Sequence, residues 1–329
     1  MAAYYYIEDL IDFDVKTELE IENGLILKVA PEEQLELLKG LLVQFGVIPF
    51  DFSLHEHRVK KRLKSGGANL EKRKNDDFRY FVLEHSVGNH YDLNFAKTLQ
   101  LMDKDFFVPF GFAKSSEIGV SIKYSFEQLS AHTYFIDKSI INFDAQKSQF
   151  YPKKWDAKSF TAEDKTQFLK ILQLLRDFEQ IKDNYIHISK ALDDFFKINE
   201  ISNNSVFKIV SYIACLELLL VDIGMDRLKS INMQLQSKVN LINNRLNNPI
   251  IVSNFFKGPD SLDLGTVIGK IYNYRSSIAH GDVLDFKKKL KILEKVSYHD
   301  VLRLLRIILK QTILFALQEP QLVSDLKSC

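Results

Sequence analysis

Residues 206–223 constrain the fold of this chain more than any other segment, because they are apolar on nearly every side of a helix. A helix with a single apolar stripe can lie at a surface, whereas one that is apolar nearly all round must be buried. We therefore expect this segment to be the central helix of a helical domain. Glu217 stands in its middle, and a carboxylate there is either satisfied by a buried partner or orients a functional side chain nearby.

Further helical patterns lie on both sides of this segment. A long helix is predicted to open at 161–164 with a capping-box sequence, and apolar positions from Phe168 to Phe195 fit one of its faces. Three more helices are expected at 227–246, 263–280 and 297–318. Pro320 is expected to stop the last of them. The sequence thus predicts an all-α bundle of about five helices over residues 158–329.

Residues 1–157 mix strand and helix patterns and predict a separate α+β domain. Asn23-Gly24 is a strong two-residue turn signal between two short runs of strand-forming residues, which favours a β-hairpin. Strands are also expected where aromatic and β-branched residues gather, at 78–83, 106–112, 118–124 and 134–143. Helices are expected at 31–45 and 92–102. No fold name follows from this pattern.

Residues 58–74 hold eight basic residues against one acid, Glu71, with Gly66-Gly67 between them. The basic residues are Arg58, Lys60, Lys61, Arg62, Lys64, Lys72, Arg73 and Lys74. Such a run is either a solvated, mobile loop or an arm that contacts phosphates. The net charge of the chain is only +1, so binding to nucleic acid would depend on local patches of this kind.

The composition of the chain excludes several classes of protein and of binding site. The two cysteines, Cys215 and Cys329, form no C-x-x-C pair, so neither a disulfide framework nor a zinc knuckle is expected. The first residues lack the basic and apolar regions of a signal peptide, and basic residues interrupt the most apolar segment, 301–317. We expect a soluble, cytoplasmic protein with no membrane span. The histidine pairs at positions 55 and 57, and 85 and 90, lack acid partners at helical spacing, so no metal site or cofactor is expected.

Residues 271–282 join an arginine, a histidine and a glycine within a short helical segment. Apolar residues recur there at helical spacing, which predicts a half-buried helix. They are Ile271, Tyr274 and Ile278. Gly281 suits the left-handed C-terminal cap, so His280 is expected in the last turn, close to carbonyls that favour a protonated imidazole. Ser276, four residues before His280, lies on the same face and could form a hydrogen bond with the imidazole ring.

Arg275 and His280 lie five residues apart, which places them about 140° from each other around a regular helix. Three arrangements would let both act at one site. The last turn could depart from α-helical geometry, or the two groups could approach one ligand from opposite sides. Alternatively, the pair from one chain could complete the pair from a second chain, which requires a dimer.

This stretch resembles the R-x(4–6)-H motif of the HEPN superfamily. Four residues separate Arg275 from His280, Gly281 follows, and Tyr272-Asn273-Tyr274 comes before. The form Arg-Ser-x-x-x-His-Gly looks like the Apea-like branch. Residues 214–219 and the helix at 235–246 fall where that branch carries its A-L-E-x-L helix and its next basic helix, so the resemblance covers roughly residues 160–320. One difference is Ser276, where catalytic members often have Asn, Asp or His.

The resemblance implies a metal-independent endoribonuclease that acts as a homodimer through the helical domain. Arg275 and His280 of two chains would line one cleft, as in toxins and antiphage defence effectors. RNA carries its own nucleophile, the 2'-hydroxyl, so an imidazole that moves protons and a guanidinium that stabilises charge are sufficient. We expect supporting roles for four residues, Ser276, Glu217, Tyr274 and Asp282. The N-terminal domain would sense a trigger, such as a regulatory partner, or select the substrate.

Two other hypotheses stay open. The helical domain could be a non-catalytic HEPN module for dimerisation and for binding RNA or nucleotide, with Ser276 marking lost activity. The chain could also be a purely structural partner of another effector. Four lysines follow the motif and are either a backbone-binding run or a solvated helix face. They are Lys287, Lys288, Lys289 and Lys291.

Overall fold

The chain forms an α+β part followed by a helical part. The computed structural model describes residues 2–8, 18–22, 24–29, 31–32, 56–62, 68–74, 81–85, 94–102, 107–114, 134–136, 161–198, 201, 205–222, 230–256, 262–281, 286, 290 and 296–329. Two compact units cover residues 1–173 and 174–329. The boundary predicted between residues 157 and 158 lies outside the described residues.

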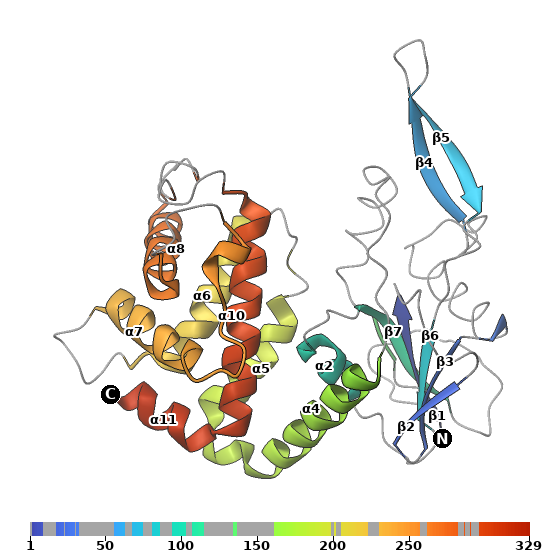
Figure 1. The fold of residues 1–329 in the computed structure, drawn as a ribbon, viewed down its shortest axis with the longest axis horizontal. Helices are drawn as coiled ribbons and strands as arrows, with labels where there is room; N and C mark the ends of the chain where they lie inside the picture. The colour runs from blue at the N-terminus through green and yellow to red at the C-terminus, as the bar shows by residue number, and fades with distance from the viewer. Residues whose placement is uncertain are drawn as a thin grey trace. The chain divides into compact units, whose positions relative to one another are not determined.

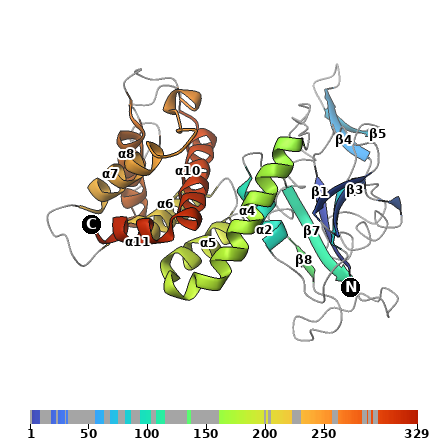
Figure 2. The same cartoon turned by 60° about the horizontal axis from the view of Figure 1, so that its bottom comes forward.

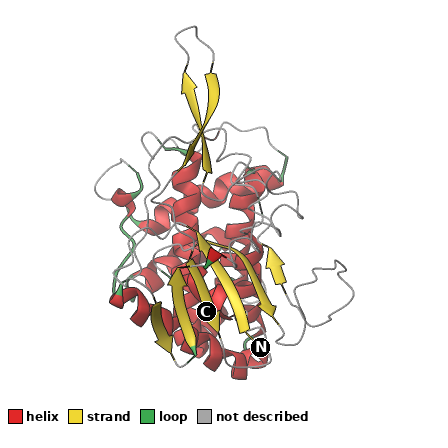
Figure 3. Ribbon diagram, turned by 90° about the vertical axis from the view of Figure 1, so that its right-hand side faces the viewer, coloured by secondary structure: helices red, strands yellow, loops and turns green. Residues whose placement is uncertain are grey.

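The N-terminal unit contains a six-stranded antiparallel sheet in the order β2-β3-β6-β1-β7-β8 (Figure 3). Its strands are β1 (Ala2–Glu8), β2 (Glu18–Glu22), β3 (Leu25–Val29), β6 (Phe81–His85), β7 (Phe107–Lys114) and β8 (Tyr134–Ile136). The predicted hairpin is confirmed, because β2 pairs with β3 and Gly24 has a φ of 79°. An Asn-Gly turn needs a positive φ of this kind.

Of the other elements predicted for this unit, some are confirmed and some lie outside the described residues. The strands β6, β7 and β8 overlap the predicted ones at 78–83, 106–112 and 134–143, and α2 (Asn94–Leu101) overlaps the predicted helix at 92–102. The strand predicted at 118–124 lies outside the described residues, as does all but residues 31–32 of the helix at 31–45. The sequence did not predict β1, although it pairs with both β6 and β7 near the middle of the sheet.

The basic segment forms an antiparallel hairpin, so of the two possibilities considered for it, the loop conformation is not observed in its described residues. β4 (Glu56–Arg62) pairs with β5 (Ala68–Lys74) in a separate two-stranded sheet (Figure 1). Arg58 stands opposite Lys72, and His57 stands opposite Arg73. Backbone hydrogen bonds hold such a ladder whatever charge the side chains carry, so a charged sequence does not exclude strands. Lys64 lies outside the described residues.

Seven α-helices are described after residue 161 (Figures 1 and 2). They are α4 (Ala162–Ile181), α5 (Ile186–Ile198), α6 (Val206–Leu220), α7 (Ile231–Asn243), α8 (Leu264–Ala279), α10 (Tyr298–Gln318) and α11 (Pro320–Ser328). The predicted central helix is confirmed, because α6 contacts α5, α7, α8, α10 and α11 and buries Ile213, Leu216 and Leu219 completely. None of these helices is long and apolar enough to cross a membrane.

Two helix predictions need correction, and together they account for the two helices beyond the five expected. The helix that opens at Thr161 has the predicted capping box, in which Asp164 N donates to Thr161 Oγ1 at 3.3 Å and Thr161 N donates to Asp164 Oδ2 at 2.7 Å. It is not continuous, however, because a 3₁₀ turn at Lys182–Asn184 separates α4 from α5. Pro320 follows α10 as predicted but also begins α11, since proline fits the first turn of a helix.

Candidate functional site

The helix α8 carries the motif, and its ends agree with the sequence prediction. Asp263 is the N-cap, and its side chain accepts a hydrogen bond from Thr266 N at 2.9 Å. Hydrogen bonds from Asn240 and Thr266 lower the pKa of Asp263 to about 2. At the other end His280 is the C-cap and Gly281 has a φ of 78°, the left-handed conformation expected of the following glycine. Both helix termini are therefore fixed by local sequence.

Two glycines let α8 approach α7 closely (Figures 1 and 2). A Cβ added at Gly265 would lie 2.5 Å from Asn240 Nδ2 and 2.8 Å from the backbone oxygen of Gln236. One added at Gly269 would lie 2.4 Å from Gln236 Nε2. Asn240 Oδ1 accepts a hydrogen bond from Gly265 N at 2.8 Å. These glycines therefore serve helix packing.

Arg275 pairs with Glu217 on the central helix. Arg275 Nη2 donates to Glu217 Oε2 at 3.0 Å, and the two side chains are 22% and 20% exposed. The guanidinium carbon also lies 5.8 Å from the centre of the Tyr272 ring, within cation–π range. Among the described residues, Arg275 Nε and Glu217 Oε1 are buried without a hydrogen-bond partner. The pair thus keeps an unused donor and an unused acceptor.

Burial dominates the electrostatics of this pair. The pKa of Glu217 lies above its ordinary value, because desolvation raises it more than the positive charge of Arg275 lowers it. The pKa of the Tyr272 hydroxyl is also raised, first by burial and then by the charge of Glu217. A half-buried carboxylate of this kind is costly without its cation. Two roles were considered for Glu217, namely a satisfied core carboxylate and a group that orients a functional side chain. The contact with Arg275 is compatible with both.

His280 lies in different surroundings. The residue is exposed, and its backbone N–H donates to Ser276 O at 3.1 Å, as in a regular α-helix. The helix tightens only at Gly281, whose N–H donates to Ile278 O at 3.0 Å. No hydrogen bond joins the side chains of the half-buried Ser276 and His280, both of which lie in the described part of the chain. The first of the three arrangements, a distorted last turn that brings Arg275 toward His280, is therefore not observed.

Tyr274 anchors the helix in the core. It is 4% exposed, and its ring packs edge-on against Phe286 at 5.3 Å, which in turn packs against Tyr298 at 5.7 Å. Burial raises the pKa of Tyr274. The Tyr298 hydroxyl donates to Ser205 O at 2.5 Å, just before the central helix. Tyr274 therefore holds α8 in place, while the neighbouring Tyr272, to which the sequence assigned no role, lies beside Arg275.

Other predicted site residues belong to the N-terminal unit or fall outside the described residues. Arg58, Lys60, Lys61 and Arg62 are on β4, and Lys72, Arg73 and Lys74 are on β5, in the N-terminal unit. Asp282 and the four lysines at 287–289 and 291 are outside the described residues. Within the described ranges, no group of three histidine, cysteine, aspartate or glutamate side chains is placed to hold a metal ion.

A scan against protein-family models, a search of curated proteins and a search of solved structures each found no match to this chain. Chemically, α8 offers an exposed imidazole, which can donate or accept a proton, and a guanidinium that can bind an oxyanion. These two groups suit reactions at phosphate esters.

Proposed function

We propose that this chain is a metal-independent endoribonuclease of the HEPN type, in which Arg275 and His280 act on an RNA phosphate. The observation that carries the proposal is the fixed position of Arg275. The hydrogen bond to Glu217 uses Nη2, and the side chain stays 22% exposed, so the guanidinium can still offer its outer N–H donors to a phosphate. The exposed His280 ends the same helix. A guanidinium binds two phosphate oxygens at once, which an ammonium cannot do with the same geometry.

The reaction uses the nucleophile that RNA carries. An imidazole removes the proton of the 2'-hydroxyl, and the 2'-oxygen attacks the adjacent phosphorus. Arg275 stabilises the negative charge that develops on the phosphate oxygens. The bond from phosphorus to the 5'-oxygen breaks, and that oxygen receives a proton. The products are a 2',3'-cyclic phosphate and a 5'-hydroxyl.

A dimer is part of the proposal because of the helix geometry. The α-helical hydrogen bond continues through His280, so Arg275 and His280 stay about 140° apart around the axis. Two arrangements remain, namely approach to one ligand from opposite sides or completion of the site by a second copy. The second arrangement supplies two histidines, one as base and one as acid, as the HEPN resemblance implies.

The hairpin β4–β5 supports RNA as the substrate. Residues at alternate positions of a strand share a face, and the register aligns these positions across the two strands. Five basic residues and one acid, Glu56, thereby occupy one face of the hairpin. The basic residues are Arg58, Lys60, Arg62, Lys72 and Lys74. An excess of basic residues of this kind favours a polyanionic backbone as the partner.

A second candidate is a non-catalytic module that binds RNA or nucleotide. The half-buried Arg275–Glu217 pair favours it, because an arginine whose main partner is a carboxylate also suits a purely structural role. In that case the chain would retain RNA without producing new 5'-hydroxyl ends. Ser276, at a position where catalytic members often have Asn, Asp or His, fits this candidate as well.

Incubation of the purified full chain with total RNA and a tRNA pool, in EDTA, tests the choice. The wild type is compared with His280→Ala, whose exposed position makes loss of folding an unsuitable explanation for loss of activity. Cleavage that persists in EDTA and disappears in the variant is the expected result. Retention of intact RNA by both proteins in a filter-binding assay would favour the non-catalytic module instead.

A further inference from the structure

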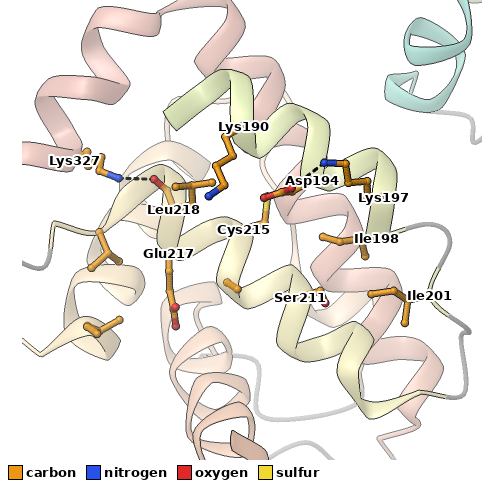
Figure 4. Close-up of a pocket in the computed structure, with 13 residues that line it drawn as sticks. Lys190, Asp194, Lys197, Ile198, Ile201, Ser211, Cys215, Glu217, Leu218 and Lys327 are labelled. Carbon is orange, nitrogen blue, oxygen red and sulfur yellow. Dashed lines mark hydrogen bonds and ion pairs between the residues drawn. The ribbon is translucent and has the colours of Figure 1, made fainter. Parts of the chain in front are cut away.

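A pocket of about 550 Å³ opens in the helical unit beside the central helix (Figure 4). Residues of α5, α6, α7 and α11 line it, and neither Arg275 nor His280 belongs to its wall. Its volume falls in the range of roughly 300–1,000 Å³ that is typical of small-molecule sites. Glu217 contributes to the wall, but its carboxylate points away toward α8, where it pairs with Arg275 (Figure 4).

The pocket wall carries more basic than acidic side chains. Lys190, Lys197 and Lys327 line it together with Asp194 and Glu217. Both acids have a cation of their own, since Lys197 Nζ lies 3.7 Å from Asp194 Oδ1 and Glu217 pairs with Arg275. That leaves Lys190 and Lys327 as charges that no acid of the pocket wall balances. Two such cations match the charge of a phosphate monoester, which is about −1.5 to −2 near neutral pH.

Lys327 is held in place for such a role. Its Nζ donates to the carbonyl oxygen of Leu218 at 2.5 Å, near the end of α6, and keeps further N–H donors. Burial lowers the pKa of Lys327, and the charge of Asp222 opposes this in part. An anion in the pocket would favour the charged ammonium and relieve the cost of its desolvation. In Figure 4, Lys190 and Lys327 lie toward the Leu218 end of the pocket.

The remaining wall is largely apolar. Ile198 and Ile201 lie toward the other end of the pocket, beside Ser211 (Figure 4). The Ser211 hydroxyl already donates to Phe207 O at 2.9 Å, so it is left as a hydrogen-bond acceptor. These apolar side chains suit the flat or aliphatic part of a ligand, and the Ser211 oxygen suits a hydroxyl or amine donor on that part.

We propose that this pocket binds a phosphorylated small molecule of mononucleotide size, with its phosphate on Lys190 and Lys327 and its apolar body against Ile198 and Ile201. The site goes beyond the proposed nuclease function, because its phosphate-binding groups, Lys190 and Lys327, are separate from Arg275 and His280, although Glu217 of its wall pairs with Arg275. Binding and RNA cleavage can therefore be tested independently.

Isothermal titration calorimetry of the full chain with AMP, GMP, CMP and UMP tests the proposal, with the matching nucleosides and inorganic phosphate as comparisons. At least one nucleotide should bind saturably, and its nucleoside should bind about tenfold more weakly, the value of one charge-assisted hydrogen bond. Lys190→Gln should weaken nucleotide binding by about the same factor. Lys270→Gln is the matched control, because Lys270 is an exposed lysine on α8 that does not line the pocket.

A second variant keeps the test independent of charge. Ala214 is exposed on α6 and lines the pocket, so Ala214→Trp should occupy the space without disturbing the core and should block binding. The proposal is wrong if none of the four nucleotides binds, or if neither Lys190→Gln nor Ala214→Trp changes their affinity. Equal affinity for inorganic phosphate would overturn the claim of an apolar body. Loss of binding in His280→Ala, with normal binding in Lys190→Gln, would place the nucleotide at the proposed nuclease site instead.

Discussion

Arg275 and His280 share one helix but belong to different parts of the molecule. Arg275 reaches back to the central helix, where it neutralises a half-buried carboxylate beside an aromatic ring. His280 is exposed at the helix end, and its ring forms no hydrogen bond or ion pair with another described residue. Of the two side chains, only the histidine can be removed without cost to the fold. Loss of activity in an arginine variant can come from lost stability or from lost catalysis. Loss of activity in a histidine variant reports catalysis alone.

His280→Ala has the largest expected effect on activity and should leave stability nearly unchanged, in contrast to a change at Arg275. Removing a proton-transfer group should lower the rate of RNA cleavage by about a hundredfold or more. The free energy of unfolding should change by no more than about 0.5 kcal/mol, because the side chain is exposed. Single-turnover cleavage and urea unfolding on the same preparation measure both quantities. A large loss of stability would mean that His280 is also structural and would remove the contrast with Arg275.

Gly265→Ala tests the helix that positions both residues. Its new methyl group would meet the backbone oxygen of Gln236 at 2.8 Å, and backbone moves less readily than a side-chain end. We expect a loss of about 1–3 kcal/mol in unfolding free energy. Gly269→Ala is the matched comparison, because its nearest contact is the flexible amide of Gln236, so it should lose less. Equal losses in urea unfolding would show that the α7–α8 spacing does not depend on Gly265.

Arg275→Ala should destabilise the fold by about 1–2 kcal/mol, because it leaves the carboxylate of Glu217 half-buried without its cation. Arg275→Ala combined with Glu217→Gln should recover part of that loss, since the amide carries no charge. Urea unfolding of the two single variants and the double variant gives the coupling energy. Additive effects would indicate that the 3.0 Å contact contributes nothing measurable. Because Arg275→Ala also affects catalysis in our proposal, its activity should be lost even under conditions where it is fully folded.

The smallest expected effect is a change in pH dependence. The pKa of Glu217 in the folded chain lies above its ordinary value of 4.5, because burial outweighs the charge of Arg275. A carboxyl with a raised folded pKa contributes stability below its unfolded pKa and loses that contribution as pH rises through the folded pKa. The wild type should therefore lose stability relative to Glu217→Gln as pH rises above 4.5. Parallel stability curves for the two proteins would show that burial does not dominate this site.

Local sequence signals predicted α8, the helix that carries Arg275 and ends at His280. The start of the helix near Asp263, the apolar spacing through Tyr274 and Gly281 after the last turn each depend on neighbouring residues, and the structure agrees with all three predictions. The buried central helix was predictable for the same reason, since an all-round apolar segment has only one favourable environment. The hairpin at Asn23-Gly24 was encoded locally as well.

Features that depend on long-range packing were missed. The run Tyr4-Tyr5-Tyr6-Ile7 has strand-forming residues, but its pairing with both β6 and β7 depends on strands that lie far along the chain. The break at Lys182–Asn184 was hidden because the apolar spacing continues across it from α4 to α5. The pocket was also missed, although Lys190, Asp194 and Lys197 recur at helical spacing on one face of α5. Its remaining wall comes from helices that only the fold brings together.

The chemical identity of the RNA ends tests the central claim most directly. The full chain is incubated with a short RNA of known sequence, and mass spectrometry identifies the termini of the fragments, with His280→Ala as the control. Attack by the 2'-hydroxyl predicts a 2',3'-cyclic phosphate on one fragment, a 5'-hydroxyl on the other, and neither with the variant. Fragments with a 5'-phosphate and a 3'-hydroxyl, or the same cyclic phosphates from His280→Ala, would contradict a nuclease centred on Arg275 and His280.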